Sequence, residues 1–338
     1  MKLTSLIITL CAAFSAAHSI YAQSYIHLLP EPSETIYLYP EGQNSDKGLD
    51  CTSGPKESNG VTKNEECDGY GHISYVGDKA RISLYFPENP NGQMIVVCPG
   101  GGYWVVSTHN EGGMVADWLL SKGITVAVLT YRLPYGHWEA PLTDVQNTFR
   151  YCREHSKGWG INQIGIMGFS AGGHLAATAS TQYCDHVTKP DFSVLIYPVI
   201  SFDETITHID TRNNLLGYKR WHENSMEADE WENVQKTYAG LIERFSNEKQ
   251  VNADTPPTFL AHSTDDKTVS VENSIRYYSN LIKYGVQSEM HIYPTGGHGW
   301  SFRSEKFLGK GNDVFKYARN EFEASLERWL ETIRTQPN

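Results

Sequence analysis

The sequence predicts an α/β protein with a mostly parallel central sheet and helices on both faces. Continuous apolar runs at residues 94–98 and 192–197 are typical of strands that are buried on both faces. Helical patterns, such as residues 114–122 and 143–156, alternate with these runs, and this alternation favours a parallel sheet. The 338 residues, 40% of them apolar and 20% charged, are enough for one large domain or two smaller ones.

The elements follow in a regular order after a less regular beginning. Residues 23–70 are polar and rich in turn-forming residues, with one edge strand expected at 36–38, and residues 73–76 and 80–86 are expected to form two short strands around a tight turn. The expected core elements are strands at 94–98, 124–131, 163–167, 192–197, 258–262 and 288–293, and helices at 114–122, 143–156, 171–183, 271–284 and 314–333.

The strand–helix alternation is interrupted once. Residues 201–254 are polar and helical in pattern, and residues 227–245 alone make a plausible amphipathic helix. We interpret this stretch as an insertion over the carboxyl ends of the strands, where such sheets bind ligands. The predicted organisation is therefore an irregular, edge-strand segment at 23–80 and an α/β domain at 81–338 that carries the insertion.

The N-terminus is typical of an exported protein. Lys2 precedes a short apolar run at residues 3–17, and a small residue, Ala22, follows a polar break. We predict a secretory signal at residues 1–22, cleaved after Ala22, and a periplasmic or extracellular location. A membrane anchor would need about 20 apolar residues, and this run is shorter.

Charge and cysteine content narrow the function classes. The net charge is −11, and the absence of a Lys/Arg cluster speaks against a nucleic-acid partner. Of the six cysteines, Cys11 lies in the predicted signal, so an odd number remains and at least one thiol is free. Cys51 and Cys67 bracket a polar segment and either pair or stay reduced. No His/Cys spacing indicates a metal site, and no motif calls for a cofactor.

The stretch Gly168-Phe-Ser-Ala-Gly172 has the G-x-S-x-G pattern of a nucleophile elbow. It follows an apolar strand pattern and precedes an Ala-rich helical one, which is the context that the motif requires. A sharp strand-to-helix turn forces the serine into strained backbone conformations and leaves no room for a Cβ on either side. Ser170 is therefore the predicted nucleophile, and the Ala171 N–H would help to stabilise an oxyanion.

A nucleophilic serine needs a histidine base and an acid that orients it, and in such sheets both follow later in the chain. His298 lies between two glycines after the strand at 288–293, and Asp265 and Asp266 follow the strand at 258–262. Only one of these adjacent aspartates can serve, and the residues alone do not choose between them. We interpret the other core histidines, His174 and His262, as packing or hydrogen-bonding residues.

These motifs resemble the α/β-hydrolase superfamily, and more narrowly its secreted bacterial carbohydrate-esterase branch, described as acetylxylan esterase-like. The resemblance covers most of residues 92–300 and includes Pro99–Tyr103, Gly168–His174, Arg212–Gly217, Thr255–Thr258 and Gly296–Gly299. It implies a catalytic triad of Ser170, Asp266 and His298, with Asp266 preferred over Asp265. It also implies that the oxyanion donors are the N–H groups of Gly101, Gly102 and Ala171.

The resemblance implies a serine carboxylesterase that removes acetyl groups from plant cell-wall polysaccharide or oligosaccharide. Tyr103, Trp104 and Trp300 flank the predicted site and would either stack on sugar rings or pack in the core. A lipase or short-chain lipid esterase is the first alternative, although the insertion is strongly charged. A prolyl-oligopeptidase-like peptidase would need a large N-terminal domain, and a catalytically inactive binding module would not need the triad. The sequence says nothing about the oligomeric state.

Overall fold

The computed structural model describes residues 25–39, 65–77, 79–217 and 228–335, with side chains described from residue 232 in the last of these ranges. The predicted signal at 1–22 and Cys51 lie outside the described residues, so signal cleavage and the Cys51–Cys67 pairing stay predictions. No helix in the described ranges is long and apolar enough to cross a membrane.

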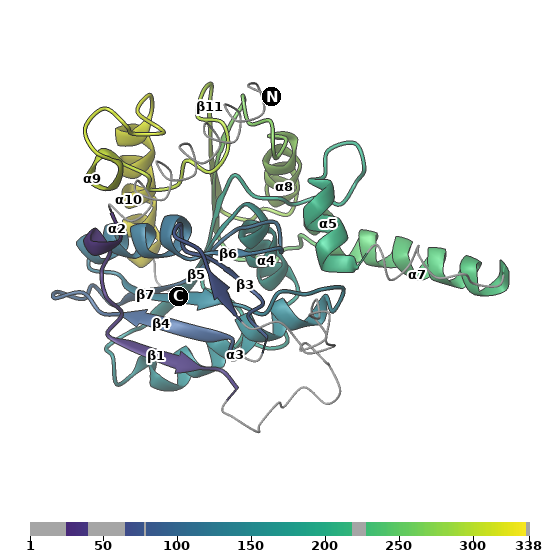
Figure 1. The fold of residues 1–338 in the computed structure, drawn as a ribbon, viewed down its shortest axis with the longest axis horizontal. Helices are drawn as coiled ribbons and strands as arrows, with labels where there is room; N and C mark the ends of the chain where they lie inside the picture. Colours follow the sequence, from purple (N-terminus) through teal and green to yellow (C-terminus); the bar gives the residue numbers. More distant parts are fainter. Residues whose placement is uncertain (1–24, 40–64, 78, 218–227, 336–338) are drawn as a thin grey trace, which may run out of the picture.

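The main sheet has eight strands in the order β1-β4-β7-β5-β8-β9-β10-β11. The six strands from β7 to β11 are mutually parallel, whereas β4 pairs antiparallel with both β1 and β7. The arrangement confirms the predicted fold class (Figure 1). The bounds are β1 (Glu34–Tyr37), β4 (Arg81–Tyr85), β5 (Gln93–Cys98), β7 (Thr125–Thr130), β8 (Gln163–Phe169), β9 (Ser193–Ile196), β10 (Thr258–Ser263) and β11 (Ser288–Tyr293).

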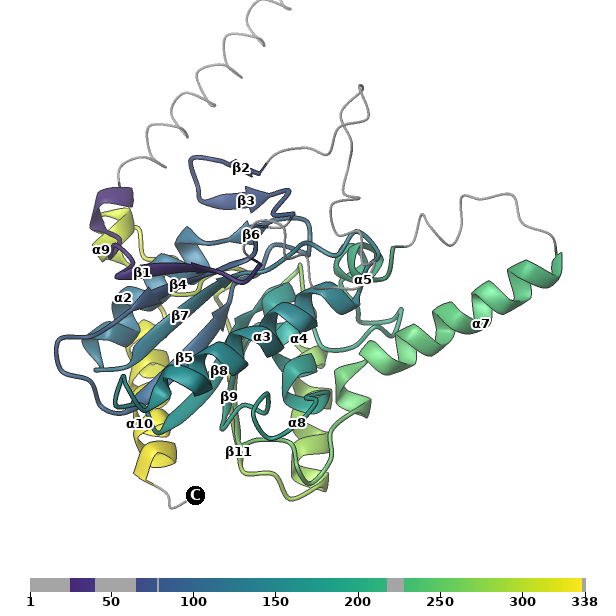
Figure 2. The ribbon, with the colours of Figure 1, turned by 90° about the horizontal axis from the view of Figure 1, so that it is seen from below.

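Helices cover both faces of this sheet and bury its side chains in two separate clusters (Figure 2). Alternate residues of β5 belong to different clusters because successive strand side chains point to opposite faces. Met94 and Val96 pack with one set of helices, and Ile95 and Val97 pack with the other. The first set is α3 (Glu139–Ser156), α4 (Ser170–Thr181) and α8 (Glu272–Lys283), and the second is α2 (Met114–Ser121) and α10 (Arg319–Thr335).

The structure corrects the expected pairing of the first strands. β3 (His72–Ser74) pairs with β2 (Glu66–Cys67) and β6 (Val106–Ser107) in a separate three-stranded sheet, whereas β4 joins the main sheet. Tyr75 and Gly77 both have positive φ, at 55° and 57°, and they turn the chain between the two sheets. The two strands predicted around a tight turn therefore exist but do not pair with each other. This small sheet carries His72 toward the carboxyl end of the main sheet.

Two helix boundaries also differ from expectation. Helix α3 begins at Glu139 rather than 143. Pro141 is tolerated in the first turn because the N–H group that proline lacks would have no hydrogen-bond partner there. Helix α10 begins at Arg319 rather than 314, because the Asp313 carboxylate accepts a hydrogen bond from the Phe315 N–H at 2.7 Å and holds a turn. Short elements complete the chain: η1 (Ile26–Leu28), η2 (His109–Gly113), η3 (Asn247–Lys249) and α9 (Glu305–Leu308).

The stretch at 201–254 contains α5 (Ile209–Leu216) and α7 (Ala228–Phe245). Helix α7 extends away from the sheet, as both ribbon views show (Figures 1 and 2). Its C-terminal half is anchored through the buried side chains of Tyr238, Leu241 and Phe245. Helix α5 starts at the N-cap residue His208, which places that imidazole beside the pocket described next.

Candidate active site

Ser170 lies at the sharp turn between β8 and α4, with a left-handed φ of 51° that few non-glycine residues adopt. A Cβ on Gly168 would lie 2.2 Å from the carbonyl oxygen of Gly172, and a Cβ on Gly172 would lie 2.1 Å from that of Cys98. Both glycines are therefore required because α4 passes so close to the strands. The strained turn and the two close approaches are what the sequence pattern predicts for a nucleophile elbow.

Three loops at the carboxyl ends of β8, β10 and β11 bring Ser170, Asp266 and His298 into a hydrogen-bonded chain. The Ser170 hydroxyl lies 2.9 Å from His298 Nε2, and His298 Nδ1 lies 2.7 Å from Asp266 Oδ2. A carboxylate can only accept, so Nδ1 carries the hydrogen and Nε2 is left to accept the serine proton. This tautomer is the one that a general base requires.

Asp266 is fully buried and heavily hydrogen-bonded. Its Oδ1 accepts hydrogen bonds from the N–H groups of Thr268 and Val269 at 2.8 and 2.9 Å, and His262 Nε2 lies 3.3 Å from Oδ2. Burial by itself would raise the pKa of the Asp266 carboxyl, but the hydrogen bonds from His262, His298 and Val269 outweigh it and lower that pKa well below its ordinary range. Asp266 therefore stays ionised beside His298.

The neighbouring Asp265 has a different contact. Its Oδ1 accepts a hydrogen bond from the Gly297 N–H at 2.8 Å, so it fastens the loop that carries the histidine. The structure thus places Asp266, and not Asp265, against the His298 ring. His262 is buried between two polar groups: its Nδ1 lies 2.8 Å from Ser274 Oγ, and its Nε2 lies 3.3 Å from Asp266 Oδ2.

The loop after β5 curls beside the serine. Gly101 and Gly102 have φ values of 126° and 62°, and both line the pocket that contains Ser170. The loop is closed by hydrogen bonds from the N–H groups of Trp104 and Val105 to the Gly101 carbonyl, at 2.9 and 3.0 Å. The Ala171 N–H lies in the first turn of α4, where backbone donors have no partner within the helix. The glycine loop and the first turn of α4 therefore both lie beside Ser170.

Glu111 is a buried carboxylate that sequence reasoning did not single out as a site residue. It lies on the π-helical turn η2, where Oε2 accepts the Gly100 N–H at 2.7 Å and Oε1 accepts the Tyr197 hydroxyl at 2.8 Å. The Tyr197 ring lies 4.9 Å from the ring of His298. Burial raises the Glu111 pKa, against these two hydrogen bonds. Glu111 and Gly112 are part of the family resemblance, which was the available signal, but the resemblance gave Glu111 no role.

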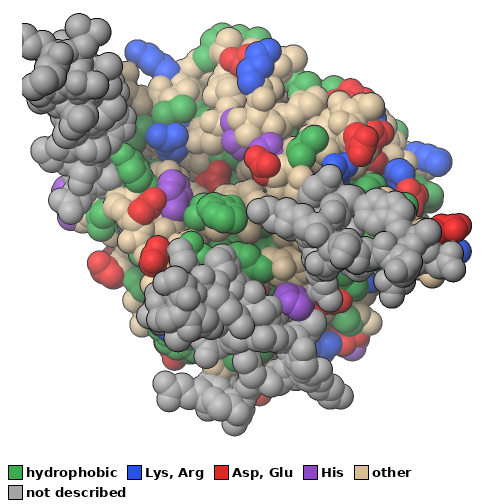
Figure 3. All heavy atoms as spheres, turned by 45° about the vertical axis from the view of Figure 1, so that its right-hand side comes forward, with side chains coloured by type: hydrophobic (Ala, Val, Ile, Leu, Met, Phe, Trp, Pro, Cys, Tyr) green, Lys and Arg blue, Asp and Glu red, His purple; other side chains and the backbone are tan. Residues whose placement is uncertain are grey.

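The pocket around Ser170 has a volume of about 290 Å³, and most of the side chains that line it carry polar groups. His72 reaches it from the small sheet, His208 from the start of α5, and Arg303 from the loop after His298. On the face shown in Figure 3, acidic and basic side chains are mixed, and histidine side chains lie near the centre. The lining residues are His72, Gly101, Gly102, Val105, Ser107, Asn110, Glu111, Ser170, His208, Thr268, His298, Gly299 and Arg303.

Of the three aromatic residues for which both sugar stacking and core packing were open, Tyr103 and Trp300 are buried in the core. Tyr103 is 1% exposed, and its hydroxyl lies 3.0 Å from His174 Nδ1. Trp300 is fully buried and stacks on Phe315 with ring centroids 4.1 Å apart. Their side chains are core residues at the bases of the active-site loops, which corrects the sugar-stacking interpretation for these two residues. Trp104 is 57% exposed, but it is not among the residues that line the pocket.

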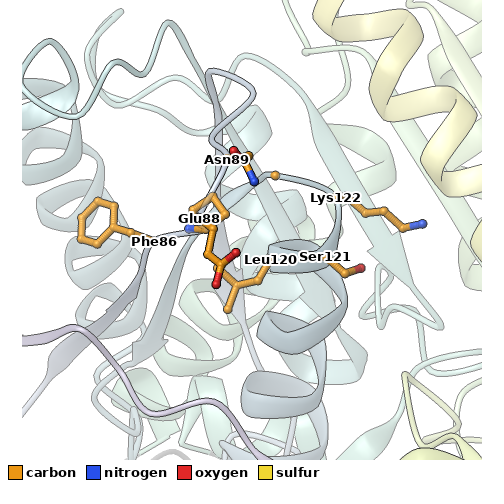
Figure 4. Close-up of a pocket in the computed structure, with 8 residues that line it drawn as sticks. Phe86, Glu88, Asn89, Leu120, Ser121 and Lys122 are labelled. Atoms are coloured by element: carbon orange, nitrogen blue, oxygen red, sulfur yellow. The ribbon is translucent and has the colours of Figure 1, made fainter.

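A second pocket lies at the other end of the strands, away from Ser170 (Figure 4). It has a volume of about 600 Å³ and is bounded by residues 86–89 and 120–123, at the amino ends of the parallel strands. Two of its polar side chains have structural partners: the Ser121 hydroxyl donates to the Trp118 carbonyl, and Lys122 pairs with Glu327. In the described part of the chain, no group of three or more His, Cys, Asp or Glu side chains is arranged to hold a metal ion.

The fold and the elbow define an α/β-hydrolase of the serine type. The chain belongs to the BD-FAE family, whose model matches residues 82–281.

Individual relatives agree with this assignment. The chain is 38% identical to an acetylxylan esterase of Xylanibacter ruminicola over 75% of this chain and 48% of that protein. It is 30% identical to endo-1,4-beta-xylanase B of Butyrivibrio fibrisolvens over 63% of this chain and 33% of that protein. The chain therefore spans about half the length of the first curated relative and a third of the second.

A solved structure covers more of the fold. The acetyl ester-xyloside bifunctional hydrolase of Caldicellulosiruptor lactoaceticus matches with a TM-score of 0.63 and 32% identity. The match covers 90% of this chain and 98% of that one. The similarity therefore extends over nearly the whole chain of that hydrolase, beyond the elbow and its neighbouring loops.

Proposed function

We propose that this protein is a serine carbohydrate esterase that removes acetyl groups from plant cell-wall polysaccharide or its oligosaccharides. The observation that carries the proposal is the hydrogen-bonded chain from Ser170 through His298 to Asp266, at 2.9 and 2.7 Å, in a polar pocket. The substrate class is supported by relatives that are named an acetylxylan esterase, a xylanase and an acetyl ester-xyloside hydrolase.

In the first half of the reaction, the Ser170 hydroxyl attacks the acetyl carbonyl while His298 Nε2 takes its proton. The ionised Asp266 stabilises the imidazolium that forms, and the N–H groups of Gly101, Gly102 and Ala171 stabilise the oxyanion. The intermediate then collapses. His298 gives its proton to the leaving sugar oxygen, which releases the free hydroxyl and leaves an acetyl group on the serine.

In the second half, water attacks the acetyl-serine with His298 as the base again. The same backbone N–H groups stabilise the second oxyanion, and its collapse returns the proton to Ser170 and releases acetate.

The polar lining favours a sugar ester over a lipid ester. Val105 is the one apolar side chain among the residues that line the pocket within the described chain. A site for long acyl chains would need extended apolar walls, because each buried methylene contributes about 0.8 kcal/mol only where it leaves water. Histidine, asparagine and arginine side chains offer hydrogen bonds to sugar hydroxyls instead.

Mass spectrometry of the intact protein during turnover of an activated acetyl ester tests the acyl-serine step. We expect a transient mass increase of one acetyl group that maps to the peptide containing Ser170. The Ser170→Ala variant, with its fold checked by circular dichroism, is the matched control and should show neither the adduct nor turnover. An adduct that persists in this variant, or one that maps to another residue, would refute the assigned nucleophile.

We also propose that the protein is exported after cleavage of a signal behind Ala22. The proposal is supported by the basic residue, short apolar run and small residue at the N-terminus. N-terminal sequencing of protein recovered from the periplasm or medium of an expressing bacterium tests it. A chain that begins at residue 23 is expected, and full-length protein confined to the cytoplasm would contradict export.

A further inference from the structure

The pocket that contains Ser170 also holds a cation that forms no ion pair with any described residue. Arg303 lines this pocket, and among the residues whose side chains the structure describes no carboxylate lies within ion-pair distance of its guanidinium. Its one side-chain hydrogen bond is a long one, 3.4 Å from Nη1 to the Gly299 carbonyl, and its Nε is shielded from water without any partner. An arginine has five N–H donors, so most of this donor capacity is unused.

The two acidic groups of the site, Glu111 and Asp266, have other hydrogen-bond partners. Both oxygens of Glu111, which lines the same pocket, accept hydrogen bonds from Gly100 and Tyr197. Asp266 is held by His298 and by two backbone N–H groups. Two buried arginines show the contrast, because both are paired: Arg132 binds Asp144 at 2.6 Å, and Arg319 binds Asp313 at 3.1 Å. Arg303 differs from them in facing the reaction pocket unpaired.

The position of Arg303 suits it to bind substrate rather than to stabilise the fold. Its Nη1 contacts Gly299, the residue directly after the base His298, so the charge lies next to the reacting groups. His208 lies in the same pocket and accepts a hydrogen bond from Thr211 at Nδ1, which leaves Nε2–H as a donor. Burial lowers the pKa of His208, so it acts as a neutral donor. Together these groups form a donor-rich wall.

We infer that this wall recognises a carboxylate carried by the ester substrate, and that the preferred substrates are acetylated oligosaccharides bearing a uronic acid. This inference rests on the proposed esterase function. A guanidinium fork matches a carboxylate and forms strong charge-assisted hydrogen bonds with it. A partly shielded arginine is costly unless it is paired, and a uronate supplies that partner when the substrate binds.

Two matched oligosaccharides test the inference: an acetylated xylo-oligosaccharide and the same molecule with a glucuronic acid branch. We expect wild-type kcat/KM for acetate release to favour the acidic substrate by on the order of tenfold or more. Arg303→Gln should bring the ratio of the two values close to one, and Arg303→Lys should keep part of the preference as a point charge. Because each ratio is measured on one preparation, a loss of folded protein cancels.

Arg150→Gln is the control variant, because it also replaces an arginine by glutamine. Arg150 lies on α3, away from the pocket, and forms an exposed ion pair with Asp185. The control variant should keep the wild-type ratio. A parallel pair of nitrophenyl esters, the acetate and the hemisuccinate, shows on which side of the ester the carboxylate is read. A preference confined to the hemisuccinate would overturn the uronic acid in favour of an acidic acyl group.

A wild-type ratio near one in both pairs, or a preference that survives Arg303→Gln, would overturn the carboxylate-binding role. Failure of the proposed function has a different signature, which is the absence of acetate release from either oligosaccharide. If Arg303→Gln does not fold, Arg303→Lys and competition on the wild type decide the question. Free glucuronate should then inhibit more strongly than xylose, and equal inhibition would contradict the inference.

Discussion

Replacing Asp266 with asparagine should abolish most of the activity while leaving the fold intact. Asp266 Oδ1 accepts two backbone hydrogen bonds, from Thr268 and Val269. An amide nitrogen cannot accept them, so the asparagine oxygen must occupy that position. The amide NH₂ group then takes the place of Oδ2, 2.7 Å from His298 Nδ1. A donor there forces the hydrogen onto Nε2, and this tautomer cannot accept the proton of Ser170.

The expected loss is large for this reason. The variant lacks both the reactive tautomer and the negative charge that stabilises the imidazolium, and such a change lowers kcat by on the order of 10⁴. This factor corresponds to about 5.5 kcal/mol of transition-state free energy. Initial rates of nitrophenyl acetate hydrolysis at saturating substrate measure it directly, with Tm from circular dichroism as a check on folding.

Asp265→Asn is the matched control, because an asparagine oxygen can still accept the Gly297 N–H hydrogen bond that Asp265 accepts at 2.8 Å. Its kcat should stay within about threefold of the wild-type value. The reasoning is refuted if Asp265→Asn is the more damaging change. It is also refuted if a folded Asp266→Asn variant retains more than about a tenth of the wild-type kcat.

Three further predictions follow from the same contacts. Gly101→Ala should lower kcat by about 10²–10³, because its Cβ would lie 2.1 Å from the Val105 carbonyl oxygen. Gly102→Ala is the comparison variant, since a Cβ on Gly102 meets nothing within 4 Å. Equal kcat values for the two variants would contradict this prediction. Glu111→Gln should lower kcat about tenfold with little change in KM, since the carboxylate positions the oxyanion loop and does not bind substrate; a rise in KM alone would point to substrate binding instead. Burial lowers the pKa of His174 to about 4, so the unfolded chain binds an extra proton between about pH 6.5 and 4, and acidification across this window should remove about 3 kcal/mol of unfolding free energy. Denaturant titrations of the wild type and His174→Gln should show a smaller loss in the variant, and parallel pH profiles would disprove the assignment.

The fold class and the position of the elbow were predictable from sequence because their causes are local. Strands buried on both faces must be continuously apolar, and the close approaches at Gly168 and Gly172 admit no Cβ. The residues alone did not choose between the two adjacent aspartates, and the preference for Asp266 over Asp265 came from the family resemblance. Adjacent aspartates share every local property, and only the course of the loop decides which one turns toward His298.

Other features depend on contacts between distant segments and have no local signature. Trp300 flanks His298 in sequence, yet its ring packs against Phe315 in the core. Glu111 and Arg303 look like ordinary surface charges in the sequence. The significance of Glu111 arises from its burial beside Gly100, and that of Arg303 from the absence of an ion-pair partner among the described residues. The separate sheet of β3 likewise depends on pairing with β6, more than 30 residues later.

Acetate release from acetylated xylo-oligosaccharide, followed by NMR, tests the central claim most directly. A companion series of nitrophenyl esters with increasing acyl length reports the shape of the acyl site. We predict acetate release by the wild type and none by Ser170→Ala, with ester activity falling steeply beyond about four carbons, because overpacking a tight slot costs about 1–3 kcal/mol. An ester profile that peaks at about eight carbons or more, with no acetate released from the oligosaccharide, would contradict the account and favour a lipid esterase.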